Sequence, residues 1–214
     1  MPVGTYSPNA SAVDGYVAEQ NTNVTWAAKH DAADATSASD SDASENPVVC
    51  QAGTTTDRWS NMRRGFYLFD TSSLPDNAKI RSATFGLYIT AVANDFNSSV
   101  CLVAGTPASD TAIGTADYDQ FGTTQLASDV AISSISTNNY NNWTLNATGL
   151  GLISKTGITK FGLVSNHDRT NTAPTWASGS QSVIVAQFSE GANKPKLIVS
   201  YSLGAALNLT SKKW

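Results

Sequence analysis

The clearest pattern in the chain is an alternation of apolar and polar positions between residues 82 and 90. This period of two places one face of a strand on a core and the other face toward water. The run 66–69 before it is continuously apolar, and the intervening segment 72–77 contains Ser, Pro, Asp and Asn, which favour turns. The apolar members of the alternation are Ala83, Phe85, Leu87 and Ile89. The pattern predicts two strands joined by a turn, and hence a sheet protein.

Shorter apolar runs recur along the rest of the chain and predict further strands. We expect them at residues 13–18, 23–28, 48–52, 99–105, 130–135, 140–145, 159–165, 181–188 and 195–201. The Ser- and Asp-rich run 30–46 indicates a long surface loop. One short helix is predicted near residues 147–155, with Asn146 or Thr148 as its N-cap. These elements are typical of an all-β fold, a two-sheet antiparallel β-sandwich of the jelly-roll kind.

The predicted strands define a single domain with an extension at each end. Residues 1–12 are expected to form a flexible N-terminal arm, because Pro2, Gly4 and Pro8 interrupt any regular element. The β-sandwich domain spans residues 13–201, and residues 202–214 form a C-terminal extension. Arms of this kind suit docking on neighbouring subunits, so we expect a homo-oligomer or part of a larger assembly.

Composition and charge narrow the classes of partner. Charged residues make up 14% of the chain and its formal net charge is -4, so no large basic field exists to attract nucleic acid. No window of 18 apolar residues occurs, so no membrane insertion is expected. The N-terminus begins with Met and lacks the basic and apolar regions of a secretory signal. Such a sheet protein is expected on a virion released by lysis, or outside the cell after removal of a signal.

Two cysteines, Cys50 and Cys101, lie in apolar runs that resemble strands. Two is the minimum for a disulfide, but spacing alone does not show that the two residues meet. The alternative is a pair of buried free thiols that act as small hydrophobic side chains. The sequence leaves both interpretations open.

The supply of catalytic residues argues against an enzyme. The only histidines are His30 and His167, both in predicted loops. His167 adjoins Asp168, but neighbours in sequence rarely present the geometry of a catalytic triad. No nucleophile elbow, zinc-protease motif or phosphate-binding glycine loop occurs. A pair of carboxylates of the glycosidase kind is not excluded by sequence. We expect a protein without catalytic residues.

Carboxylates two residues apart in loops suggest a site for structural calcium, which prefers oxygen ligands. The candidate ligands are Asp40, Asp42, Glu45, Asp117 and Asp119. Their spacing does not match an EF-hand, and acidic loops are more often simply solvated. No other cofactor is expected.

Aromatic side chains in or beside loops suggest a site for glycans. Exposed rings stack on the apolar faces of sugars, while amides hydrogen-bond the hydroxyl groups. The alternative is that these rings cover the ends of the sandwich or fill its core. Phe121 lies in the same loop as one of the candidates. The candidates are Trp26, Trp59, Trp176, Tyr118 and Asn166.

Five segments carry a resemblance to a known family. They are Arg64-Gly65-Phe66, the segment 69–75 (FDTSSLP), the segment 80–84 (IRSAT), the segment 159–163 (TKFGL) and the closing segment 194–201 (KPKLIVSY). Together they resemble the DNRLRE-type β-sandwich modules, which are similar in shape to carbohydrate-binding modules. The resemblance spans residues 13–201, and the loops at 30–46 and 117–119 are similar to phage-like versions.

The resemblance implies a non-enzymatic jelly-roll module of bacterial and archaeal surface proteins, secreted polysaccharide-processing enzymes and virus-like gene products. It supplies no ligand residues, because the family has none in common. We therefore predict a structural module on a virion surface, such as a bacteriophage capsid decoration, fibre or tail-associated protein, that packs against other virion subunits. The alternative is a carbohydrate-binding module of a secreted or cell-surface protein.

Overall fold

Antiparallel strands make up most of the regular structure, as the sequence predicts. The structure is a computed structural model, and it describes residues 1–9 and 13–203. Within those residues, twelve strands join in one continuously hydrogen-bonded sheet. The strands are β1 (Val3–Tyr6), β2 (Asp14–Val24), β3 (Ser37–Ser39), β4 (Ser44–Ala52), β5 (Trp59–Asp70), β6 (Ala78–Asn94), β7 (Ser99–Ala104), β8 (Val130–Ala131), β9 (Asn139–Thr144), β10 (Ile158–Ser165), β11 (Gln181–Gln187) and β12 (Lys196–Leu203).

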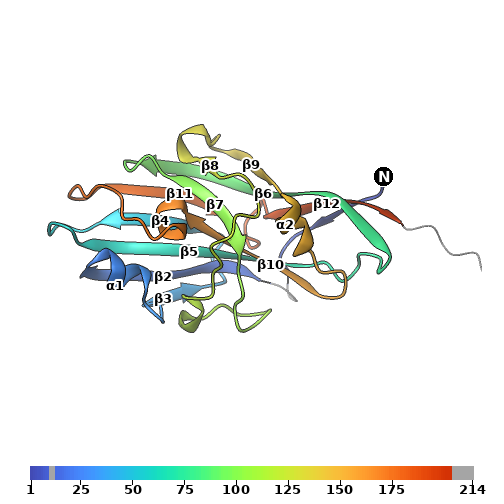
Figure 1. Cartoon of the computed structure of the whole chain (residues 1–214), viewed down its shortest axis with the longest axis horizontal. Helices are drawn as coiled ribbons and strands as arrows, with labels where there is room; N and C mark the ends of the chain where they lie inside the picture. The colour runs from blue at the N-terminus through green and yellow to red at the C-terminus, as the bar shows by residue number, and fades with distance from the viewer. Residues whose placement is uncertain (10–12, 204–214) are drawn as a thin grey trace, which may run out of the picture.

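The sheet curls into two facing layers, which gives the predicted β-sandwich (Figure 1). One layer contains β3, β2, β5, β10, β7 and β8, and the other contains β1, β12, β6, β11 and β9. Strand β4 pairs with β5 on one side and with β11 on the other, so it joins the two layers. The predicted layers are therefore halves of one sheet rather than separate sheets.

The alternating positions of β6 face the space between the layers. Ala83, Phe85, Leu87 and Ile89 are all buried in the main core. Tyr67 and Phe69 of β5 meet them from the opposite layer, and the rings of Tyr67 and Phe85 lie 5.1 Å apart. Burial of these side chains is the main source of stability.

A third, non-strand layer covers the outer face of β2, β5, β10 and β7. It is formed by the segment 105–129 between β7 and β8, drawn in yellow-green in Figure 1. Ile113 and Tyr118 of this segment pack on Val17, Phe66 and Leu68 in a second buried cluster. Strand β5 is therefore buried on both faces, which explains why residues 66–69 are apolar without interruption.

Short helices close the ends of the layers. The α-helices are α1 (Trp26–His30), α2 (Ala147–Gly151) and α3 (Asn166–Arg169), and the 3-10 helices are η1 (Thr115–Asp117) and η2 (Ile132–Ser134). Helix α2 confirms the helix predicted near residues 147–155, and Asn146 caps it by accepting a hydrogen bond from the Gly149 amide at 3.0 Å. No helix in the described part of the chain is long and apolar enough to cross a membrane.

Several local predictions are wrong. The strand expected at 23–28 is instead the end of β2 followed by α1, because Thr25 caps a helix there. The loop expected at 30–46 contains β3 and the start of β4. The strand expected at 130–135 is the two-residue β8 followed by η2.

The expected arm at residues 1–12 is also partly wrong. Strand β1 lies inside it and pairs with β12, so that Val3 lies opposite Ser200. Backbone hydrogen bonds to a strand edge outweigh the interruptions by Pro and Gly. Of the extension expected at 202–214, Ser202 and Leu203 belong to β12, and the rest lies outside the described residues.

Candidate functional site

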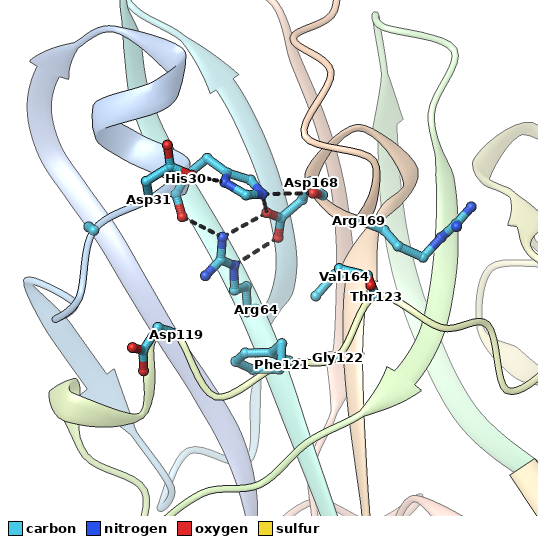
Figure 2. Close-up of a pocket in the computed structure, with 11 residues that line it drawn as sticks. His30, Asp31, Arg64, Asp119, Phe121, Gly122, Thr123, Val164, Asp168 and Arg169 are labelled. Carbon is cyan, nitrogen blue, oxygen red and sulfur yellow. Dashed lines mark hydrogen bonds and ion pairs between the residues drawn. The ribbon is translucent and has the colours of Figure 1, made fainter.

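A hollow of about 210 Å³ opens where α1, the covering segment and α3 meet above the sheet. Figure 2 shows its side chains, which come from parts of the chain that are far apart in sequence. We call this hollow the pocket. It is lined by His30, Asp31, Ala32, Arg64, Asp119, Phe121, Gly122, Thr123, Val164, Asp168 and Arg169.

A buried ion pair forms the floor of the pocket. Arg64 on β5 donates from Nε to Asp168 Oδ2 at 2.9 Å and from Nη2 to Asp168 Oδ1 at 2.8 Å. Its Nη1 donates to the Tyr118 carbonyl at 2.6 Å and its Nη2 to the His30 carbonyl at 2.9 Å. Arg64 thus ties α1, the covering segment and α3 to the sheet. A planar bidentate pair of this kind is strong and directional.

Burial and the ion pair shift the pKa of Arg64 in opposite directions. Burial by itself lowers the pKa of Arg64, but the Asp168 carboxylate outweighs it, and the net shift is upward. The guanidinium also lies 4.2 Å from the centre of the Tyr118 ring. Arg64 therefore stays charged, and four of its five N–H groups are used in the bonds described above.

His30 forms the upper wall of the pocket between two acceptors (Figure 2). Its Nδ1 lies 2.5 Å from Asp31 Oδ1 and its Nε2 lies 2.9 Å from the Asp168 carbonyl oxygen. Both partners accept hydrogen bonds, so the two bonds form together only on a ring that carries both protons. Neither ring nitrogen is free to act as a base in this arrangement.

Phe121 forms the lower wall of the pocket, and a glycine in the sheet, Gly162, leaves room for its ring. The ring stacks on Phe66 with centroids 4.1 Å apart. A Cβ on Gly162 would meet the Phe121 ring at 2.5 Å, so a glycine is needed below it. Phe121 is only half-buried, which leaves part of the ring open beside the pocket.

Helix α1, which carries His30, is anchored from below by Lys29. The Lys29 ammonium group is fully buried and donates to the carbonyl oxygens of Glu19 at 3.2 Å and Ser60 at 3.3 Å, and also to the Thr22 hydroxyl. Burial lowers its pKa, and the Glu19 carboxylate at 3.7 Å opposes that shift. This contact fixes the short helix on β2 and β5, which a five-residue helix does not achieve alone.

The three tryptophans that were candidates for glycan binding lie together in one cluster, away from the pocket. Trp59 is buried, and Trp26 and Trp176 pack half-buried beside it with Phe96. The Trp26 ring N–H donates to Asn171 Oδ1, and that of Trp176 donates to the Arg58 carbonyl oxygen. Their surroundings are those of packing residues at the end of the sandwich, and none of the three lines the pocket.

The other two glycan candidates lie near the pocket without lining it. Tyr118 has no exposed surface and donates from its hydroxyl to the Lys29 carbonyl oxygen at 3.0 Å, so it is not available to a ligand. Asn166 accepts a hydrogen bond from the Ser99 amide at 2.8 Å and begins α3. Phe121, which shares the loop of Tyr118, is the aromatic residue that borders the hollow.

The calcium candidates are engaged in hydrogen bonds and ion pairs within the protein. Asp40 accepts from the Ile113 amide, Asp42 from the Ser39 hydroxyl, and Asp117 from the Gly114 and Ala108 amides. Glu45 pairs with Arg63 at 2.9 Å, and Asp119 accepts from the Gln120 side chain. Within residues 1–9 and 13–203, no group of three or more His, Cys, Asp or Glu side chains is placed to hold a metal ion.

The disulfide alternative is wrong, because both cysteines are free and buried. Cys50 packs with Trp59 at the end of the sandwich, whereas Cys101 packs with Val103 and Val164 on another part of the sheet. Burial raises the pKa of both thiols. They are therefore inert hydrophobic side chains.

Comparison with known proteins does not identify the chain. No protein family matches it, so the DNRLRE resemblance stays a prediction, and no curated protein matches it either. Among solved structures, a mutant of Xylanase10C from Cellvibrio japonicus in complex with xylopentaose is 10% identical with a TM-score of 0.37, covering 92% of this chain and 29% of that one.

A second similar structure concerns the promiscuous specificity of carbohydrate-binding modules from the β-sandwich superfamily. It is 12% identical with a TM-score of 0.26, and the match covers 75% of this chain and 54% of that one. Both likenesses are too distant to support an argument about function. The case for a function therefore depends on the pocket itself.

Proposed function

We propose that this protein is a non-enzymatic β-sandwich module that binds a glycan in the pocket beside Phe121. The observation that carries the proposal is a half-exposed aromatic ring that borders the same hollow as several polar side chains. Sugar-binding sites combine these two features, because a ring packs on the apolar face of a sugar while polar groups bond its hydroxyls.

The polar groups around the ring can both donate and accept. The fifth N–H group of Arg64, on Nη1, has no acceptor among the described residues, and Figure 2 shows this nitrogen turned away from Asp168. Asp31 and Thr123 are exposed at the rim of the pocket. Donors and acceptors on several sides suit a ligand with many hydroxyl groups.

The size of the pocket limits the ligand. A volume of about 210 Å³ is below the roughly 300–1,000 Å³ of sites that enclose drug-sized molecules. The pocket therefore holds one sugar unit, and the rest of the glycan extends into solvent.

The geometry gives His30 and Asp168 no catalytic role. The one imidazole at the pocket, His30, has both nitrogens in hydrogen bonds, and Asp168 accepts two bonds from Arg64. A general base and a nucleophile need free lone pairs within reach of the substrate. The virion-surface role predicted from the sequence stays a prediction, and it is compatible with glycan binding.

A glycan array followed by calorimetry on the strongest ligand tests the proposal. Phe121→Leu keeps an apolar side chain above Gly162 but removes the aromatic face, so we expect about tenfold weaker binding. Tyr140→Leu is the matched control, because Tyr140 lies half-buried on β9 and does not line the pocket. An array without binding, or a loss caused by Tyr140→Leu but not by Phe121→Leu, contradicts the proposal.

A further inference from the structure

Each basic side chain at the pocket already contacts a carboxylate. Arg64 pairs with Asp168 at 2.8 Å, and Arg169 donates from Nη2 to Asp129 at 2.9 Å. His30 contacts Asp31 at 2.5 Å. No cation at the pocket is therefore left to bind an acidic group of a ligand.

One carboxylate at the pocket has no such partner. Asp119 is exposed, and its side chain accepts a hydrogen bond only from the neutral amide of Gln120, at 2.5 Å. Among the described residues, no Lys, Arg or His side chain forms an ion pair with it. Asp31, whose side chain is 58% exposed, contacts only the His30 ring. Four carboxylates at the pocket, those of Asp31, Asp119, Asp129 and Asp168, thus face two guanidinium groups and one imidazole ring, so negative charge is in excess.

We infer that the pocket prefers a sugar unit that carries a protonated amine. This inference rests on the proposed glycan-binding function and names the class of sugar. The amine approaches Asp119 while the ring packs on Phe121 and the hydroxyls reach Arg64. The net charge of -4 on the whole chain adds a weak attraction for a cationic polysaccharide, and the same charges disfavour uronic or sialic acids.

Three hexasaccharides that differ only at C2 test the inference. Cellohexaose carries a hydroxyl group there, the chitin hexamer an acetamide, and the chitosan hexamer an amine. At mildly acidic pH and low salt, we expect the chitosan hexamer to bind about fivefold more tightly than cellohexaose in calorimetry. The preference should fall as salt is added, because exposed charges are screened.

Two variants test whether the charge of Asp119 causes the preference for the amine. Asp119→Asn should remove most of the preference for the amine and leave the affinity for cellohexaose unchanged. Asp76→Asn is the matched control, because it removes the same charge from the exposed turn between β5 and β6, away from the pocket. Circular dichroism confirms that both variants keep the fold.

The outcomes separate the inference from the proposed function. Equal affinity for the amine and hydroxyl hexamers, no binding of any of the three, or a preference that survives Asp119→Asn overturns the inference. The glycan array and Phe121→Leu test the proposed function independently. If only neutral glycans bind beside Phe121, the proposed function stands and the preference for an amine is refuted.

Discussion

The two outer faces of the sandwich differ, although both belong to the same sheet. The outer face of β2, β5, β10 and β7 is covered by the segment 105–129 and bordered by α1 and α3 (Figure 1). Within residues 1–9 and 13–203, no such layer covers the outer face of β6, β9 and β12, which presents Thr84, Tyr88 and Ile198 half-exposed. The covered face contains the pocket, which shows that the third layer, rather than the sandwich itself, creates the site.

The open face also carries aromatic side chains, but none of them lines the pocket. Tyr88 and Tyr140 lie edge to face with ring centres 5.4 Å apart, and Lys196 Nζ lies 3.3 Å from the Tyr140 ring centre. These contacts occur between neighbouring strands. The covered face, in contrast, is built from contacts between residues far apart in sequence, such as Arg64 and Asp168.

The largest expected loss of stability comes from a substitution in the floor of the pocket, on the covered face. Arg64→Met removes both hydrogen bonds to the buried Asp168 carboxylate and leaves it only the longer contact with His30 Nε2, at 3.5 Å. We therefore expect a loss of about 3–5 kcal/mol in the free energy of unfolding, measured in urea. The double variant Arg64→Met with Asp168→Leu should recover much of the stability, because both members of the buried ion pair are then gone. A single variant as stable as the wild type would refute the role of Arg64 as the anchor of the covering layer.

Asp14 shows what a buried carboxylate does without a cation. Burial raises its pKa from 3.8 to about 7, although the Ser189 amide donates to it. Because the folded protein holds the proton more tightly, this group favours folding at low pH. Its contribution falls by up to roughly 4 kcal/mol as pH rises from about 4 to about 8.

Asp14→Asn keeps an acceptor for the Ser189 amide and removes the titration. Between about pH 4 and about pH 8, we expect the stability of the variant to decline less than that of the wild type. At about pH 8 the variant should therefore be the more stable protein. Urea unfolding at several pH values measures both quantities. Parallel pH profiles for the variant and the wild type would contradict the prediction.

A pair of glycine substitutions compares the two faces directly. Gly162→Ala places a Cβ at 2.5 Å from the Phe121 ring, so the ring must move; we expect a loss of about 1–3 kcal/mol and weaker glycan binding. Gly86→Ala on the open face meets Asn142 Oδ1 at 2.9 Å and Lys196 Cγ at 3.4 Å, which are flexible side chains. It should change stability by less than about 1 kcal/mol and leave binding intact. Equal effects at both positions would remove the distinction between the faces.

The smallest effect is expected from Tyr140→Leu on the open face. The substitution removes the edge-to-face contact with Tyr88, the contact with Lys196 and the hydrogen bond from the Tyr140 hydroxyl to the Lys194 carbonyl oxygen. At an exposed site we expect their combined contribution to be about 1 kcal/mol. Thermal unfolding measures this change. A loss several times larger would show that the open face contributes to stability as much as the covered one.

Patterns local in sequence account for the parts of the fold that were predicted. The alternation at 82–90 predicts the inward side chains of β6, because neighbouring residues of a strand point to opposite faces. Asn146 predicts α2, because an N-cap bonds an amide three residues away. Thr25 caps α1 in the same way, but its signal is weak beside the strand-like residues that precede it.

Among the candidate site residues, Asp119 lines the pocket, and Phe121 of the same loop lines it too. The other candidates were chosen by residue type, and residue type does not distinguish an exposed ring from a buried one. Tyr118 and Phe121 are three positions apart, yet one lies fully buried against Arg64 and the other half-exposed above Gly162. The packing of a loop on a sheet decides such differences.

The amino-acid sequence alone determines that this protein is an all-β sandwich, because strand periodicity and turn chemistry act between near neighbours. Tertiary structure alone decides where the pocket lies and which side chains line it. Arg64 meets Asp168 across 104 positions, and His30 meets the same residue across 138. Such pairings depend on how the covering segment and two short helices settle on the finished sheet, and no local pattern encodes that arrangement.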